Sequence, residues 1–227
     1  MLAKKYLSEV VSIKNPFKGI YTVEFKSLDR PFKYAPGQFL HIALDEDYDG
    51  IGQWPESRFF SMQSDPAEEV IRITYAVKGT FTQEMERSLR PGREVWLKLP
   101  FGELFSQPHS KTGTVFIAGG TGVTPFLSLF THESFREYMS PRIYLGYKNE
   151  DYFIYQEELA AIKNDDAQIT VFYENRDGVI DIAKIHKQNG NEVNYFISGP
   201  PVMIKIFKNK LISFGVPAEN VLSDDWE

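Results

Sequence analysis

The chain has 227 residues and contains no cysteine. This absence excludes disulfide bonds, thiolate nucleophiles, thiolate-type structural zinc and cysteine-held iron–sulfur clusters within the chain. It also lacks any apolar run long enough to span a membrane, and its first residues are too poor in apolar side chains for a signal peptide. We therefore expect a cytoplasmic protein without membrane insertion.

Basic residues are in the minority, because 25 Lys and Arg face 31 Asp and Glu, which gives a formal net charge of -6. A field of this sign disfavours nucleic acid and anionic membranes as partners. The 4 histidines are scattered without metal-ligand spacing, so no metal site is expected from them. Aromatic residues, by contrast, are abundant, with 18 Phe and 12 Tyr that could stack against planar rings.

The first hundred residues consist of short β-like runs separated by turn signals such as Asn15-Pro16 and Arg90-Pro91-Gly92. This pattern predicts a small antiparallel β-barrel. One helix is expected in this half, from Thr82 to Leu89, with Thr82 as its N-cap. The expected strands cover residues 6–13, 20–25, 38–44, 59–62, 70–77 and 94–99.

From Thr114 onward the pattern changes to alternating strands and helices, which predicts an α/β domain with a Rossmann-like parallel sheet. We place the β-barrel domain at residues 1–107 and the α/β domain at residues 114–227, with a polar connector between them. The expected strand and helix pairs are 115–118 with 125–131, 142–146 with 155–163, 169–173 with 180–186, and 195–198 with 201–214.

A glycine-rich turn joins the first strand and helix of the second half. The apolar run 115–118 predicts a buried strand, and Thr124 followed by Pro125 predicts the start of a helix. Glycines in between let the backbone turn tightly, so that a bulky anion such as a cofactor pyrophosphate can approach the amides of the helix. A tight turn without a ligand is the alternative, because Pro125 stands where the GxGxxG fingerprint has its last glycine. The glycines are Gly119, Gly120 and Gly122.

Two further segments, both in the first half, are candidate phosphate sites. In Arg58-Phe59-Phe60-Ser61, strand geometry places Arg58 and Phe60 on one face, which then offers a cation for phosphate and a ring for stacking. The segment 79–82 precedes the expected helix and could hold phosphate through its amides. A surface arginine and ordinary helix capping are the respective alternatives.

Together these segments resemble the ferredoxin reductase-like flavoprotein oxidoreductases, a family with a flavin-binding barrel followed by a pyridine-nucleotide domain. The resemblance covers nearly the whole chain in the family's order, without an iron–sulfur domain. The matching segments are Tyr34–Phe39, Arg58–Ser61, Gly79–Thr82, Pro100–Gly102, the glycine-rich turn, Gly146–Asp151, Ser198–Met203 and Asp224–Glu227.

In the barrel, the resemblance implies that Arg58 contacts the flavin pyrophosphate, Phe60 packs on the flavin, and Ser61 bonds near the nitrogen that accepts hydride. Phe60 replaces the family's usual tyrosine, so the ring is kept and the phenol is lost. FAD is expected rather than FMN. The remaining flavin-binding candidates are Phe59, then Tyr75, Ala76, Val77 and Lys78 at the ring edge, and Gly79, Thr80, Phe81 and Thr82 at the phosphates.

In the second half, the resemblance implies a site for a nicotinamide dinucleotide. Ser198 stands where the family usually has a cysteine near the nicotinamide, and Trp226 occupies its C-terminal aromatic position. Both join Ser61 as catalytic candidates. The nucleotide-binding candidates are Gly119, Gly120, Thr121, Gly122, Thr124, Lys148, Gly199 and Pro200.

The resemblance implies hydride transfer from NAD(P)H to bound FAD and electron transfer to an external acceptor, which a chain without cysteine needs. The expected acceptor is ferredoxin, flavodoxin or an oxygenase component. A reductase of free flavin or small molecules, or an electron-transfer subunit of a larger complex, are the alternatives. Near the expected adenosine site, Glu174 favours NADH whereas Lys148 and Arg176 favour NADPH, and we expect NADH.

Two other features have competing interpretations. The acidic loop from Asp45 to Glu56 matches the EF-hand calcium pattern, but its flanks read as strands, so a surface loop is favoured. Lys205, Lys208 and Lys210 share the last expected helix. They either dock an acidic redox partner or form a solvated helix face.

Overall fold

The computed structural model describes residues 2–223. The chain forms two compact units, Met1–Gly102 and Glu103–Glu227. The division falls before the connector expected at 107–113, because Leu104 is already buried in the core of the second unit. Among the described residues, no helix is long and apolar enough to cross a membrane.

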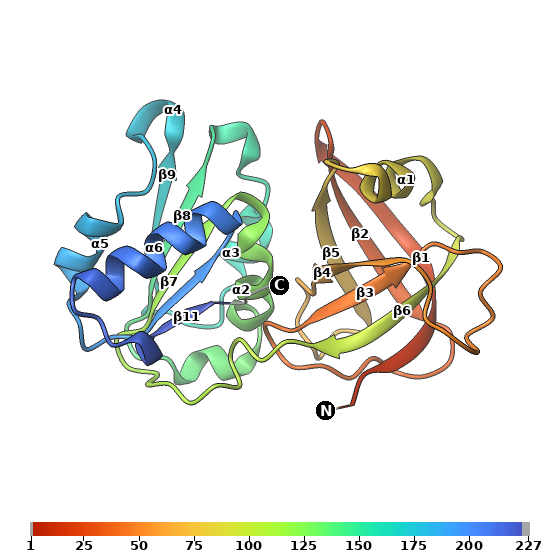
Figure 1. The fold of residues 1–227 in the computed structure, drawn as a ribbon, viewed down its shortest axis with the longest axis horizontal. Coiled ribbons are helices and arrows are strands. Elements are labelled where there is room, and N and C mark those ends of the chain that lie inside the picture. The colour runs from red at the N-terminus through yellow and green to blue at the C-terminus, as the bar shows by residue number, and fades with distance from the viewer. Residues whose placement is uncertain (1, 224–227) are drawn as a thin grey trace. The chain divides into compact units, whose positions relative to one another are not determined.

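The first unit is a curved six-stranded antiparallel sheet, as predicted (Figure 1). Its strand order is β4-β3-β6-β1-β2-β5, so the strand that carries Arg58 is an edge strand. One helix, α1, follows β5. The elements are β1 (Lys4–Phe17), β2 (Ile20–Ser27), β3 (Phe39–Ala43), β4 (Ser57–Ser61), β5 (Val70–Ala76), α1 (Thr80–Ser88) and β6 (Glu94–Phe101).

Period-two alternation builds the core of this unit. In β6, Val95, Leu97 and Leu99 are buried, while the residues between them are exposed or half-buried. The same alternation on β3 buries Leu40 and Ile42. Side chains from the strands and from α1 meet in one apolar cluster, which holds the sheet in its curved form.

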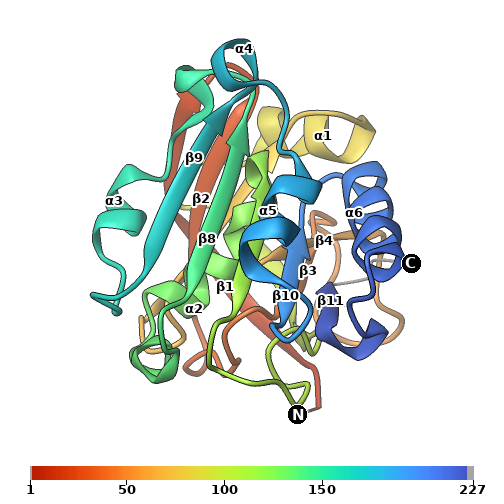
Figure 2. The same ribbon diagram turned by 90° about the vertical axis from the view of Figure 1, so that its left-hand side faces the viewer.

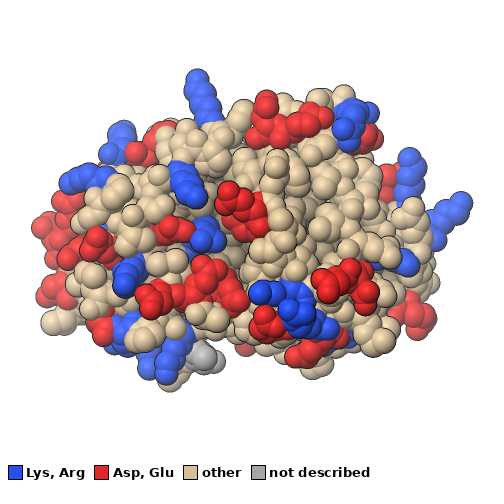
Figure 3. All heavy atoms as spheres, turned by 180° about the vertical axis from the view of Figure 1, so that it is seen from behind, with Lys and Arg blue, Asp and Glu red and all other residues tan. Residues whose placement is uncertain are grey.

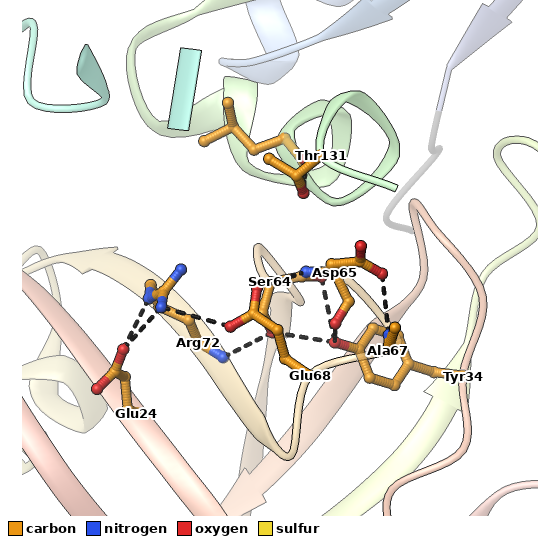
Figure 4. A network of polar contacts seen from close by, with 9 residues as sticks. Glu24, Tyr34, Ser64, Asp65, Ala67, Glu68, Arg72 and Thr131 are labelled. Carbon is orange, nitrogen blue, oxygen red and sulfur yellow. Dashed lines mark hydrogen bonds and ion pairs between the residues drawn. The ribbon is translucent and has the colours of Figure 1, made fainter. Parts of the chain in front are cut away.

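A polar network fixes the loop between β4 and β5 (Figure 4). The Tyr34 hydroxyl lies 2.9 Å from Ser64 Oγ, which accepts a hydrogen bond from the Arg72 amide. The Arg72 guanidinium donates to Glu24 from Nε and Nη2, at 2.9 and 2.8 Å. Burial raises the pKa of Tyr34, so its hydroxyl stays protonated through neutral pH. The network ties the loop to β2 and β5 and thereby fixes where β4 ends.

The second unit is the predicted parallel sheet with covering helices, in the order β11-β10-β7-β8-β9. Its strands are β7 (Val115–Gly119), β8 (Arg142–Tyr147), β9 (Gln168–Tyr173), β10 (Tyr195–Ser198) and β11 (Val221–Ser223). Its helices are α2 (Thr124–Phe130), α3 (Gln156–Ala160), α4 (Glu174–Asp177), α5 (Ile182–Asn189) and α6 (Pro201–Ser213). Short 3₁₀ turns lie at Gly120–Val123, Glu133–Glu137, Glu150–Tyr152 and Ala218–Asn220.

Different helices cover the two faces of this sheet (Figures 1 and 2). On one face, Phe116 and Phe196 pack with α2 and α3. On the other, Val115 and Ile117 pack with α5 and α6. Because α2 and α6 leave neighbouring strands toward opposite faces, the carboxyl ends of β7 and β10 form a topological switch point. Ligands of open α/β sheets bind at such points.

Several expected boundaries were wrong. Thr82 is not the N-cap of α1, because the helix begins at Thr80 with Gly79 as N-cap. The hydroxyl of Thr82 instead accepts hydrogen bonds from the amides of Lys78 and Gly79, at 2.9 and 3.1 Å. The helix expected over 155–163 covers only Gln156–Ala160. Strand β11 was not expected, because three residues carry too little periodicity to be recognised.

Candidate functional site

The glycine-rich turn lies at the switch point. Gly119 ends β7, and Gly120 has a φ of +56°, a left-handed conformation that favours glycine. A Cβ on Gly120 would meet nothing within 4 Å, so space for a ligand remains beside the turn. A Cβ on Gly122 would lie 2.4 Å from the Cα of Gly199. The two loops that leave β7 and β10 therefore approach each other through their glycine backbones.

The turn differs in one respect from the expected strand-to-helix junction. A 3₁₀ turn, Gly120–Val123, precedes α2, and the Thr124 hydroxyl donates to the carbonyl of Thr121 at 2.9 Å. The amides nearest the strand thus belong to the 3₁₀ turn rather than to α2. The open glycine backbone and these amides still suit a pyrophosphate, which needs close approach and hydrogen-bond donors.

Ser198 and Gly199 form the other wall of the same site. Ser198 pairs with Ala118 in the register of β10 and β7, which places it one residue from the glycine-rich turn. It is buried, and no hydrogen bond of its hydroxyl occurs within residues 2–223. Gly199 has a φ of +148° and leads through Pro200 into α6. The predicted nucleotide-binding residues from both loops are therefore brought together.

Met203 belongs to this wall and was missed as a functional candidate. A Cβ on Gly119 would lie 2.9 Å from the sulfur of Met203, and a Cβ on Gly199 would lie 2.6 Å from its methyl carbon. Met203 thus fills the space behind both glycines. The sequence held no clear signal for this role, because Gly199 precedes α6 and helical spacing does not relate it to Met203.

The ends of β8 and β9 carry the charged residues considered for coenzyme choice. Arg176 donates to both carboxylate oxygens of Asp177, at 3.0 and 2.9 Å, and lies 3.6 Å from Glu150. The hydrogen bonds from Arg176 lower the pKa of Asp177, and the same pairing raises that of Arg176. The Lys148 ammonium lies 5.8 Å from the centre of the Tyr152 ring. Arg176 is therefore already engaged by two carboxylates.

In the first unit, the structure brings Arg58 next to the start of α1. The guanidinium lies 5.5 Å from the centre of the Phe81 ring, although β4 and α1 are separated in sequence. Gly79, the N-cap, has no side chain, and a Cβ there would meet nothing within 4 Å. The first-turn amides of α1 consequently lack a side-chain cap. A cation and uncapped helix amides together form a donor set suited to phosphate oxygens.

The aromatic part of the expected flavin site lies beside this donor set. Phe60 is half-buried and packs against the barrel core, with its ring 6.0 Å from that of Tyr75. Tyr75 is followed directly by Ala76, Val77 and Lys78, which lead to Gly79. The two groups of predicted flavin-binding residues are therefore adjacent: the ring-edge residues of β5 continue into the phosphate-binding start of α1.

Phe59 and Ser61 lie on the opposite face of β4, as the strand period predicts. Phe59 pairs with His41 and remains 42% exposed. Ser61 pairs with Phe39 at the end of the strand, and its hydroxyl makes no hydrogen bond to any described residue. Phe59 is thus separated from the pair Arg58 and Phe60 by the strand itself, whereas Ser61 stands at the strand end.

The acidic loop from Asp45 to Glu56 runs between β3 and β4, so it has strands on both sides rather than the helices of an EF-hand. Asp45 and Asp49 accept hydrogen bonds from backbone amides within the loop. Among the described residues, no group of three or more potential ligands could hold a metal ion. Trp226 lies outside the described residues.

Charges of both signs are interspersed on the face of the molecule shown in Figure 3. That face offers no continuous basic surface of the kind that binds nucleic acid through its phosphates.

Comparison with known proteins supports the two-part organisation. Residues 116–209 match the family model of the oxidoreductase NAD-binding domain. The chain is 25% identical over 229 residues to the electron transfer subunit of dihydroorotate dehydrogenase B (NAD(+)) from Desulforamulus reducens, covering 98% of this chain and 84% of that protein. It is 24% identical over 203 residues to flavohemoprotein A of Dictyostelium discoideum, covering 83% of this chain. The match spans only 51% of that protein.

Among solved structures, a ferredoxin NADP+ reductase from Neisseria gonorrhoeae with bound FAD and NADP superposes with a TM-score of 0.76. The match covers 95% of this chain and 92% of that one at 18% sequence identity, so it shows a shared fold. The expected two-domain architecture is thereby confirmed, and the compared proteins agree with the expected resemblance to ferredoxin reductase-like flavoproteins. Residues 116–209 therefore match the NAD-binding domain of oxidoreductases, and the whole chain has the two-part fold of ferredoxin reductase-like flavoproteins.

Proposed function

We propose that this chain is a reductase that takes hydride from NADH onto bound FAD and passes the electrons to an external carrier protein. The observation that carries the proposal is the pairing of two unlike phosphate sites, one in each unit. Arg58 and the uncapped start of α1 form the first, and the glycine-rich turn against Gly199 forms the second. One chain therefore has a site for each of two phosphate-bearing cofactors.

The residues have distinct tasks in this reaction. A bound flavin supplies the redox chemistry, since it accepts two electrons as hydride and releases them singly. Arg58 and the α1 amides bind its pyrophosphate, and Phe60 supplies a packing surface for the ring. Ser61 offers a hydroxyl, free of bonds to the described residues, that can donate to the ring. Ser198 orients the nicotinamide from the end of β10.

Ser61→Ala tests this assignment directly. We expect the variant to bind FAD like the wild type but to be reduced by NADH about tenfold more slowly, a loss of about 1.4 kcal/mol of transition-state stabilisation. Anaerobic stopped-flow absorbance of the flavin measures the rate. Ser12→Ala is the matched control, because Ser12 is a half-buried strand residue of the same unit whose hydroxyl makes no hydrogen bond to a described residue. The role of Ser61 fails if its variant is reduced as fast as the control, and the whole function fails if purified protein binds no flavin.

We propose a preference for NADH because Arg176 is already paired with two carboxylates. An adenosine 2′-phosphate would have to compete with Asp177 and Glu150 for this guanidinium, and both carboxylates would repel it. NADH brings no such charge. Glu174, the first residue of α4, adds a third carboxylate in the same segment.

We therefore expect kcat/KM to be higher for NADH than for NADPH. The double variant Glu150→Gln/Asp177→Asn frees Arg176, so it should lower the ratio of kcat/KM for NADH to that for NADPH about fivefold or more. Steady-state kinetics with both coenzymes measure it. Asp165→Asn/Asp166→Asn, in an exposed turn, removes the same charge and should leave the ratio unchanged. An equal shift in both double variants would show that net charge, rather than Arg176, sets the preference.

The acceptor is proposed to be a small carrier protein such as ferredoxin, flavodoxin or an oxygenase component. Two of the compared proteins are named as an electron transfer subunit and as a ferredoxin NADP+ reductase, and the second name includes a small carrier protein. The absence of cysteine means that this chain holds no iron–sulfur cluster through thiolates to serve as its own relay.

A further inference from the structure

Helix α6 exposes an apolar surface that is unusual for this molecule. Of the twelve large apolar side chains that are exposed among the described residues, four lie between residues 202 and 214. Val202 is 70% exposed and Ile206 is 46% exposed, although both could have been polar without loss to the core. Ile204, Phe207 and Leu211 form the buried side of the helix, so Val202 and Ile206 are not needed there.

The exposed face has a defined pattern. At about 3.6 residues per turn, Val202 and Ile206 lie one turn apart along the middle of the outer face. Lys205 and Lys210 then fall on opposite sides of this pair. Both lysines are exposed, and neither forms an ion pair with any described residue. An apolar centre with a charged rim is the usual anatomy of a protein interface.

The charge of this face opposes that of the whole chain. Helix α6 contains three lysines and no acidic residue, in a protein with a formal net charge of -6. Lys208, the third lysine, donates to the Ser223 hydroxyl and so belongs to the edge of the helix rather than to its outer face. A local basic rim in an acidic protein selects for a partner with carboxylates around an apolar patch.

The helix begins beside the proposed nucleotide site. Gly199 and Pro200 lead directly into α6, and Gly199 approaches Gly122 of the glycine-rich turn. Val202 is thus three residues from a loop that lines the coenzyme site. A partner on this face docks next to a wall of the proposed coenzyme site.

We propose that the outer face of α6, formed by Val202, Ile206, Lys205 and Lys210, docks an acidic one-electron carrier protein. This rests on the proposed function. Each NADH oxidised supplies two electrons, so two carrier molecules are each reduced by one electron and one proton is released. An anionic membrane is the less suitable occupant, because Asn209 and Ser213 interrupt the apolar stripe that would have to enter the lipid.

The test compares two acceptors. Ferricyanide reports hydride transfer and electron release without protein docking, and an acidic plant-type [2Fe–2S] ferredoxin serves as the protein probe. For Lys205→Glu/Lys210→Glu, we expect kcat/KM for ferredoxin to fall about tenfold or more and its dependence on ionic strength to flatten. For Val202→Ser/Ile206→Ser, we expect a loss of about fivefold at every ionic strength. The NADH–ferricyanide rate should stay within about twofold in both.

Lys4→Glu/Lys33→Glu is the matched control, since both lysines are exposed on the first unit and the change in net charge is identical. It should retain ferredoxin reduction within about twofold. Equal losses in the control and in the α6 variants would overturn the proposal, as would ferricyanide reduction by a wild-type enzyme that leaves the ferredoxin oxidised. Binding of the wild type to phosphatidylserine vesicles, lost in the α6 variants while ferredoxin kinetics persist, would assign the face to membranes. If wild-type protein fails even with ferricyanide, the proposed function itself is wrong.

Discussion

Gly122→Ala should abolish reduction of the bound flavin by NADH, with a rate lower by about 100-fold or more, while leaving FAD bound. A Cβ at this position would lie 2.4 Å from the Cα and 2.6 Å from the amide nitrogen of Gly199. Both contacts are with backbone, so no side chain can rotate away. The loops that leave β7 and β10 must separate, and a displacement of about 1 Å in a cofactor-positioning loop costs on the order of 100-fold in rate.

The measurement separates the two units. Dithionite reduces the flavin without the nucleotide site, so its rate should be unchanged in Gly122→Ala, whereas the NADH rate collapses. Gly190→Ala is the control, since Gly190 lies in the same unit with a φ of +78° and a Cβ there meets nothing within 4 Å. Its backbone strain is therefore real but remote from the site. Equal NADH rates in the two variants would show that the Gly122–Gly199 approach does not shape the coenzyme site.

The sequence predicted the architecture because periodicity records burial. Alternation over β6 and apolar runs in β7 and β10 reflect one buried face in the first unit and two in the second. Helix ends were less accurate. Threonine is a common N-cap residue, but Thr82 is the third residue of the helix. Its hydroxyl accepts hydrogen bonds from the amides of Lys78 and Gly79. Residue type alone does not distinguish these two positions.

Spatial relations within the site needed the structure. Strand order is not encoded in local pattern, so the switch point between β7 and β10 could not be read from the chain. The contact of Gly122 with Gly199, 77 positions later in the numbering, follows from that order. The pairing of Arg176 with Asp177 was also unpredictable, because the same arginine could have pointed into solvent. The proposed preference for NADH rests on that pairing.

Arg58→Ala should yield a protein that loses FAD on purification. The guanidinium lies over the Phe81 ring at the start of α1. It is the only side-chain cation that we assign to the flavin pyrophosphate. Its ion pair with Glu56 is long, at 3.8 Å, and both side chains are largely exposed, so the arginine can turn to a phosphate at little cost. Hydrogen bonds to charged groups contribute about 1.5–3 kcal/mol each. Removing them corresponds to roughly tenfold to 100-fold weaker binding.

Titration of apoprotein with FAD, followed by quenching of flavin fluorescence, measures this loss. Arg87→Ala is the matched control, because Arg87 is an exposed arginine in the last turn of α1 that pairs with Glu84. It removes the same charge at the far end of α1 and should leave the FAD dissociation constant within about twofold. Arg58→Lys discriminates further: an ammonium keeps the charge but not the planar fork, so intermediate affinity is expected. Full affinity in Arg58→Ala would show that Arg58 does not contact the pyrophosphate.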